Sequence, residues 1–197
     1  MDEVLLRKLV WTDYRVAVLL MVMIPLVLLI WSLLKRSEAM RCLLIIYWRV
    51  ASLLMITVYL MIPAWPIAFL SGFSARVLIP ICLWFWVDLN DEIRDLPESR
   101  LKLVFTSWRW GATIYSSLGA IATIPFLSCA FSANITANYF CRIWLEAPWS
   151  YKEIFHRNST PGFLGFLGIV GLIIYVLYLG YFVFIRLGKQ GRSALEQ

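Results

Sequence analysis

Apolar residues along this chain gather into five long runs that short polar segments separate. A membrane-spanning helix needs about 20 consecutive apolar residues to cross a hydrocarbon core of about 30 Å, and each run approaches that length. We therefore predict an all-α fold: a polytopic membrane bundle of about five transmembrane helices, within one integral membrane domain covering residues 1–197. The predicted spans are residues 16–34, 42–62, 67–87, 103–127 and 162–185.

Prolines and charges set the boundaries of these spans. The sequence Pro-Ala-Trp-Pro at 63–66 ends the second span, because proline cannot continue a helix and restricts the residue before it. Residues 67–75 fit either the start of the third span or a re-entrant segment. The charged segment 88–102 must lie in water, and the mixed composition of residues 128–161 predicts an ordered extramembrane loop.

Composition excludes a soluble domain of this size. Of the 197 residues, 61% are hydrophobic and only 15% are charged, with a mean hydropathy of +0.78. A water-soluble fold of this length has too much surface for its volume to bury so many apolar side chains. The first run is also too long for the apolar region of a cleavable signal peptide, so we interpret it as a membrane span.

The formal net charge of +6 indicates contacts with membrane lipids and argues against a nucleic-acid partner. The basic residues stand in small groups at the ends of apolar runs, where they orient spans and contact anionic headgroups. One side of the membrane would hold nine of them: Lys35, Arg36, Arg41, Arg94, Arg100, Lys102, Arg186, Lys189 and Arg192. The other side would hold six: Arg7, Lys8, Arg15, Arg142, Lys152 and Arg157. This difference predicts a cytoplasmic C-terminus and an external N-terminus.

Three arginines, Arg49, Arg76 and Arg109, fall within the predicted spans. An arginine inside a membrane costs at least about 2.5 kcal/mol unless it finds a partner, water or a route to the headgroups. Arg49 and Arg109 lie at one depth near the cytoplasmic side, and Asp88 is the nearest acidic residue. We expect both to face the bundle interior, with Asp88 within ion-pairing distance of at least one. This candidate polar cluster either fixes helix packing or binds an anion or substrate.

A stripe of small and hydroxylated residues follows one face of the fourth span. Its members, spaced three or four apart as helix geometry requires, are Thr106, Arg109, Thr113, Ser116, Ala120 and Thr123. Small and hydroxylated residues suit close helix–helix contacts in membranes, so the stripe predicts a packing seam. The alternative is the wall of a polar pathway, in which Thr113 and Ser116 would extend the candidate binding cluster.

Glycines recur every third residue early in the fifth span, at Gly165, Gly168 and Gly171. Glycine costs roughly 1 kcal/mol relative to alanine in a helix in water, so this regular spacing suggests a surface that something approaches closely. We predict a packing face, with span four as the neighbour. A lipid tail or a planar pigment is the alternative occupant and the sole class of cofactor that the pattern suggests.

Metal and redox chemistry find little support in the sequence. The chain has a single histidine, His156, and its four cysteines lack metal-ligand spacing, so we expect no metal. Cys129 and Cys141 can form a disulfide if their compartment is oxidising. Asp91 and Asp95 have the DxxxD spacing with which membrane prenyltransferases hold Mg²⁺-diphosphate, but no second such motif accompanies them.

Several strings of the sequence resemble a family of uncharacterised cyanobacterial multi-pass membrane proteins, a domain of unknown function that covers nearly the whole chain. These strings are LVWTDYR at 9–15, IYWRVAS at 46–52, WFWVDLN at 84–90 and GFLGFLGIVG at 162–171, with RLGKQGR at 186–192. The resemblance implies a thylakoid or plasma membrane and proximity to photosynthetic machinery. It implies no catalytic residues.

Three hypotheses for function follow. The leading one is a non-enzymatic accessory or assembly protein of a photosynthetic thylakoid complex, which implies a membrane-protein partner. The second is a small transporter or channel subunit that uses the intramembrane arginines. The third is a lipid- or isoprenoid-modifying enzyme centred on Asp88, Asp91 and Asp95. A water-filled cavity joining Arg109 to the span-four stripe would favour transport, whereas a dry bundle would favour the accessory role.

Overall fold

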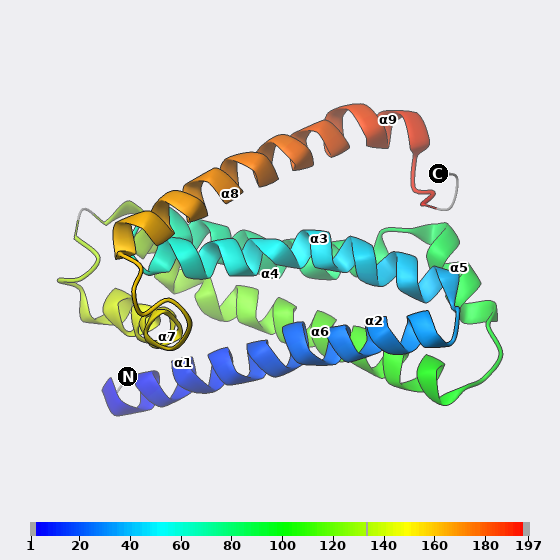
Figure 1. The fold of residues 1–197 in the computed structure, drawn as a ribbon, viewed down its shortest axis with the longest axis horizontal. Coiled ribbons are helices and arrows are strands. Elements are labelled where there is room, and N and C mark those ends of the chain that lie inside the picture. Colours follow the sequence, from blue (N-terminus) through cyan, green and yellow to red (C-terminus); the bar gives the residue numbers. More distant parts are fainter. Residues whose placement is uncertain (1–2, 133, 195–197) are drawn as a thin grey trace.

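The structure, a computed structural model, describes residues 3–132 and 134–194. Throughout this part of the chain the regular structure is helical, and five helices are long and apolar enough to cross a membrane (Figure 1). These five are Glu3–Leu34, Glu38–Met61, Ile67–Trp84, Arg100–Phe131 and Pro161–Arg186. The predicted all-α membrane bundle is confirmed.

The two ends of the bundle carry different elements. The first helix runs through α1 (Glu3–Ala17), the π-helical η1 (Val18–Met23) and α2 (Ile24–Leu34), followed by α3 (Glu38–Met61), α4 (Ile67–Trp84), α5 (Val87–Asp95) and α6 (Arg100–Thr123). Then come η2 (Ile124–Phe131), α7 (Tyr139–Phe155), α8 (Pro161–Tyr181), η3 (Phe182–Arg186) and α9 (Leu187–Gln190). Figure 1 shows α7 almost end-on, so it lies across the bundle where α1 begins, while α5 lies at the opposite end. We call these the α7 end and the α5 end.

The first helix begins at Glu3, thirteen residues before the predicted start of the first span at residue 16. Leu6 and Val10, one turn apart, are buried against Ile143 of α7. This packing holds α1 in helical form beyond the apolar run, and it places Asp13 inside a continuous helix rather than before one.

Pro25 has no N–H, so the turn of the first helix before it lacks one backbone donor. Other helices donate hydrogen bonds to carbonyls in this turn. The hydroxyl of Tyr47 on α3 donates to the Met21 carbonyl at 2.6 Å, and the indole N–H of Trp108 on α6 donates to the Leu20 carbonyl at 2.9 Å. The same two rings meet edge to face, with centroids 5.0 Å apart. Side chains of α3 and α6 at the centre of the bundle therefore bind the backbone of the first helix.

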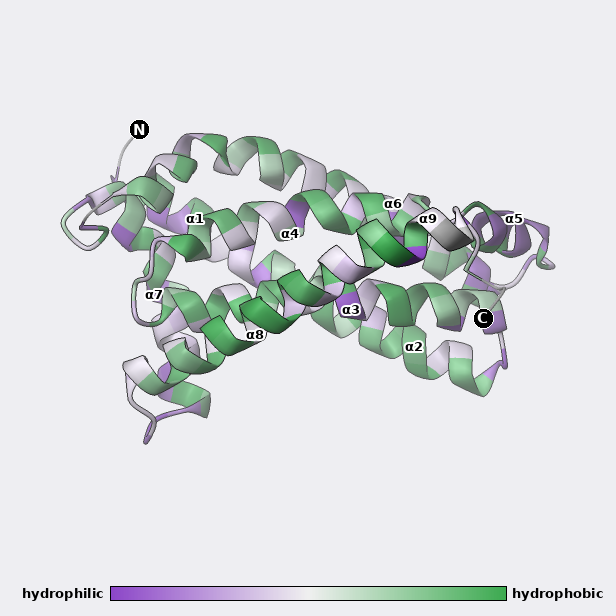
Figure 2. Ribbon diagram, turned by 90° about the horizontal axis from the view of Figure 1, so that it is seen from above, coloured by the Kyte–Doolittle hydropathy of each residue, from purple (hydrophilic) through white to green (hydrophobic). Residues whose placement is uncertain are grey.

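Helices α3 and α4 pack closely together. The hydroxyls of Thr57 on α3 and Ser71 on α4 are hydrogen-bonded at 2.8 Å and buried, and Gly72 of α4 faces Thr57. Helix α4 begins at Ile67, so the structure places residues 67–75 in the helical span rather than in a re-entrant segment. Figure 2 shows hydrophobic residues along the spans and hydrophilic ones on α5.

The glycines of α8 pack against α3, so the predicted contact with span four is wrong. A Cβ at Gly168 would lie 3.0 Å from Leu60 Cδ2 and 3.2 Å from the Leu60 backbone nitrogen. Gly165 similarly faces Pro63 and Trp65 in the α3–α4 turn. The physical reason is the connection: α7 crosses the end of the bundle between α6 and α8, so these two spans follow in sequence without packing side by side.

The segment predicted as an ordered extramembrane loop contains the 17-residue helix α7. The 3₁₀ turn η2 extends span four to Phe131, and Cys129 is joined to Cys141 by a disulfide with a Cα–Cα distance of 5.8 Å. Ile143 and Leu145 lie on the buried face of α7. The disulfide and this apolar face together hold α7 on the bundle.

Candidate functional site

A cluster around Arg109 lies inside the bundle, towards the α5 end. The Arg109 residue is only 4% exposed. Its guanidinium donates to the Leu83 carbonyl at 3.1 Å and to Asn90 Oδ1 at 2.6 Å, and lies over the Trp84 ring at 3.9 Å from the centroid. The Trp84 indole in turn donates to the Thr113 hydroxyl at 2.8 Å. Arg109 therefore faces the interior as expected, with an amide and an aromatic ring as partners.

Asp88 binds the C-terminal segment of the described chain. Its carboxylate accepts hydrogen bonds from the Ser193 hydroxyl at 3.0 Å and from the Ala194 backbone N–H at 2.6 Å. Arg192 adds a bond from Nε to the Phe85 carbonyl at 2.9 Å. Asp88 thus fastens the C-terminal segment to the start of α5, and Asn90, two residues further on, is the residue of α5 that binds Arg109.

Arg49 does not face the interior, which corrects the prediction that paired it with Arg109. Its side chain is exposed on the outer surface of α3, where Nη1 lies 3.3 Å from the hydroxyl of Tyr178 on α8. The two arginines lie at comparable depths on their helices but point in different directions, since depth does not determine which face of a helix a residue occupies.

The span-four stripe is a packing seam for most of its length. Ser116 is buried, with its hydroxyl 4.0 Å from Met21 Sδ, and Ala120 is also enclosed. The hydroxyls of Thr113 and Thr123 donate to the carbonyls one turn earlier on their own helix. The stripe thus meets the first helix through Ser116 and α4 through Thr113.

A second cluster joins the first helix, α4 and α6. Arg76 of α4 forms a salt bridge with Asp13 of the first helix. The hydroxyl of Tyr115 on α6 donates to Asp13 Oδ1 at 2.6 Å, and the Arg76 guanidinium lies 5.6 Å from the Tyr115 ring centroid. Gly119 leaves room for the guanidinium, since a Cβ there would collide with it.

Sequence reasoning identified Arg76 as an intramembrane charge but missed Asp13 and Tyr115. The predicted first span began at residue 16, so Asp13 was not counted among the intramembrane charges although it lies within the first helix. The four-residue spacing of Leu6 and Val10, which carries the apolar face to Tyr14, was the signal that would have extended this helix. Burying an arginine without a counterion is energetically costly, so an acidic residue on a neighbouring helix is the expected partner of Arg76.

A third set of polar contacts lies at the α7 end. Glu146 of α7 accepts from Arg7 Nε at 3.0 Å and from the Trp11 indole at 3.1 Å, which ties α7 to the first helix. The Tyr59 hydroxyl and His156 Nε2 are 2.8 Å apart. Burial, followed by the neighbouring Tyr59 hydroxyl, raises the pKa of Tyr151 to about 12, so this phenol stays neutral at physiological pH.

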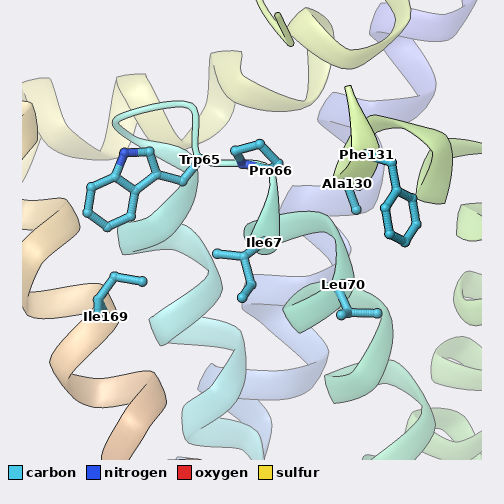
Figure 3. A pocket seen from close by; sticks show the side chains of 7 residues that line it. All are labelled: Trp65, Pro66, Ile67, Leu70, Ala130, Phe131 and Ile169. Atoms are coloured by element: carbon cyan, nitrogen blue, oxygen red, sulfur yellow. The ribbon is translucent and has the colours of Figure 1, made fainter. Parts of the chain in front are cut away.

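Two open, largely apolar pockets lie towards the α7 end. The first, between α4, η2 and α8, is lined by Trp65, Pro66, Ile67, Leu70, Ala130, Phe131 and Ile169 (Figure 3). The second lies beneath α7 and includes Arg142, Glu146 and Trp149. Neither reaches Arg109 or the span-four stripe. Among the described residues no group of three or more His, Cys, Asp or Glu side chains is arranged to hold a metal ion.

The fold and these clusters define a class: a polytopic helical membrane protein in which two of the three intramembrane arginines have partners inside the bundle. The family model described as "Protein of unknown function (DUF3177)" matches residues 7–195, and the chain belongs to this family. Searches of curated proteins and of solved structures gave no match.

Proposed function

We propose that this protein is a non-enzymatic accessory or assembly protein of a photosynthetic membrane complex. The proposal includes a thylakoid or plasma membrane of a cyanobacterium as its location and a cytoplasmic C-terminus. Its action is to bind one or more membrane subunits through its outer helical surface.

The main support comes from the binding partners of the polar groups inside the bundle. Arg109 binds Asn90 and a backbone carbonyl, and Arg76 binds Asp13. A transport pathway or an active site requires polar groups that face a space which a solute can enter, as substrate sites generally do. Here the polar side chains bind one another, which is the arrangement expected of a packed scaffold.

The shape of α8 indicates where a partner would bind. One face of α8 packs on α3 through its glycines, whereas Ile173 on the outward side is 55% exposed. A Cβ added at Gly180 would meet nothing within 4 Å. The outward surface of α8, defined here by Phe166, Ile173, Leu177 and Gly180, is therefore open to a helix of another subunit.

The test is co-purification in mild detergent with a tag placed after Gln197. Lipid can rearrange around an added indole on a surface that only lipid contacts. In a packed protein interface the same indole would clash with the partner. We therefore compare the wild type with Ile173→Trp on α8 and with the matched control Ile114→Trp on α6, where the exposed fraction is 54%. The proposal expects the same membrane subunits at fixed ratio with the wild type and with Ile114→Trp, and their loss with Ile173→Trp.

Two results would contradict the accessory role. One is purification of the chain without membrane subunits from the cells that naturally express it. The other is solute or ion flux through liposomes that contain the purified chain alone, which would favour the transporter hypothesis.

A further inference from the structure

Arg49 differs from the other two intramembrane arginines because it faces away from the bundle. It lies about 16 Å along α3 from Glu38, at 1.5 Å per residue. Its side chain is exposed, and among the described residues its side-chain partner is the Tyr178 hydroxyl at 3.3 Å. A neutral phenol does not balance a guanidinium charge, so among the described residues this cation has no counterion within salt-bridge distance, and its side chain is exposed on the outer surface of the bundle.

The direction of α3 determines where this charge is held. Cα–Cβ bonds tilt towards the N-terminus of a helix, and the N-terminus of α3 lies at the α5 end. A long arginine side chain on this surface therefore extends towards the headgroup layer of that side, as snorkelling side chains do. Arg41, two turns earlier on α3, marks the level of that layer.

Helix α8 adds groups that suit a headgroup at the same level. The Tyr178 hydroxyl is free to donate to an anion while it accepts from Arg49 Nη1. Tyr181, one turn nearer the α5 end, is also exposed, and tyrosine is enriched where spans meet the headgroups. Below Tyr178, the exposed Ile174 provides an apolar surface for an acyl chain.

We propose that Arg49 and Tyr178 bind the phosphate of one anionic phospholipid on the outer surface where α3 meets α8. Arginine pairs with phosphate through charge-assisted hydrogen bonds, which are stronger than those to neutral groups. The lipid supplies the missing counterion of Arg49, and its acyl chain lies along α8. This inference does not depend on the accessory role, because the bundle presents the same Arg49–Tyr178 site whatever its function is.

The test is native mass spectrometry of the full chain in mild detergent, titrated with phosphatidylglycerol or with zwitterionic phosphatidylcholine. We expect the wild type to retain one phosphatidylglycerol molecule in preference to phosphatidylcholine. Arg49→Gln should weaken phosphatidylglycerol binding about tenfold, since it removes a charged hydrogen-bonding partner. Tyr178→Phe should weaken it by a smaller factor. Arg94→Gln is the control, because Arg94 is an exposed arginine on α5 that pairs with Asp91.

Competing sources of the anion are separated by a second arm of the experiment. Inorganic phosphate at millimolar concentration should leave the bound phosphatidylglycerol in place. Its displacement by inorganic phosphate would overturn the lipid assignment in favour of a soluble anion. Equal retention of the two lipids, or unchanged binding in Arg49→Gln, would overturn the site itself. If Arg49→Gln does not fold, Tyr178→Phe provides the comparison, with weaker retention of phosphatidylglycerol expected and unchanged retention overturning the site.

Discussion

The salt bridge between Asp13 and Arg76 allows a quantitative test of how the bundle is held together. The two side chains are 20% and 13% exposed, and they join the first helix to α4 within the apolar region. Removing one partner of a buried pair leaves an uncompensated charge, which costs about 3 kcal/mol or more. Asp13→Asn is the sharper change, because the asparagine still offers a carbonyl oxygen to Tyr115 while Arg76 loses its counterion.

The expected shift in Tm follows from the size of the protein. For a chain of about 200 residues, 1 kcal/mol corresponds to about 2–4 °C in Tm, so Asp13→Asn should lower Tm by about 6–12 °C. The double variant Asp13→Asn/Arg76→Gln removes both charges, so it should be more stable than the sum of the single changes by about 2 kcal/mol. Thermal unfolding in mild detergent, followed by tryptophan fluorescence, measures all three.

A matched surface pair provides the control. Arg94 and Asp91 form an ion pair on α5 with side chains 74% and 52% exposed, and such pairs contribute little. Arg94→Gln should therefore change the free energy of unfolding by less than about 0.5 kcal/mol. Additive effects of Asp13→Asn and Arg76→Gln, or single effects as small as that of Arg94→Gln, would refute the assignment of a structural role to this pair.

Three further changes test other contacts of the bundle by the same unfolding assay. Gly168→Leu should lower the free energy of unfolding by about 2 kcal/mol, because the added side chain would clash with the backbone of α3. Leu177→Ala, on the outward surface of α8, should have little effect. Tyr47→Phe should cost about 2 kcal/mol, because it leaves a buried carbonyl of the first helix without a donor. Cys141→Ser should cost about 3 kcal/mol, because it removes a cross-link between residues 12 apart in sequence; equal stability of reduced and oxidised wild type would contradict this.

The spans were predictable from the sequence because lipid imposes a strong and simple pattern on a helix. Twenty apolar residues between polar segments define a span regardless of its neighbours, so four of the five began within four residues of their predicted starts. The first did not, because α1 is stabilised by contact with α7, and that contact joins residues more than a hundred positions apart. Mean hydropathy does not reveal this contact, and the spacing of Leu6 and Val10 is the local sign of a helix here.

The partners of the polar residues were less predictable than their depths. Helical rise gives depth directly, but the face that each residue presents depends on which helices are adjacent. Arg109 and Arg49 show the difference: one binds Asn90 inside the bundle and the other faces outwards beside Tyr178. The glycines of α8 show it again, since their regular spacing correctly indicated a close contact but could not identify α3 as the neighbour.

The buried part of the α6 stripe, around Ser116, is packed inside the bundle and does not line a water-filled path. Labelling of an introduced cysteine by a membrane-impermeant thiol reagent tests this directly, in a background in which the free cysteines Cys42 and Cys82 are replaced. Ser116→Cys places a thiol at a position that is 1% exposed, and Asp95→Cys places one on the water-exposed α5. We predict rapid labelling of Asp95→Cys, and labelling of Ser116→Cys only after unfolding in detergent. Labelling of folded Ser116→Cys at a comparable rate would show a water-filled path along α6 and would contradict the account.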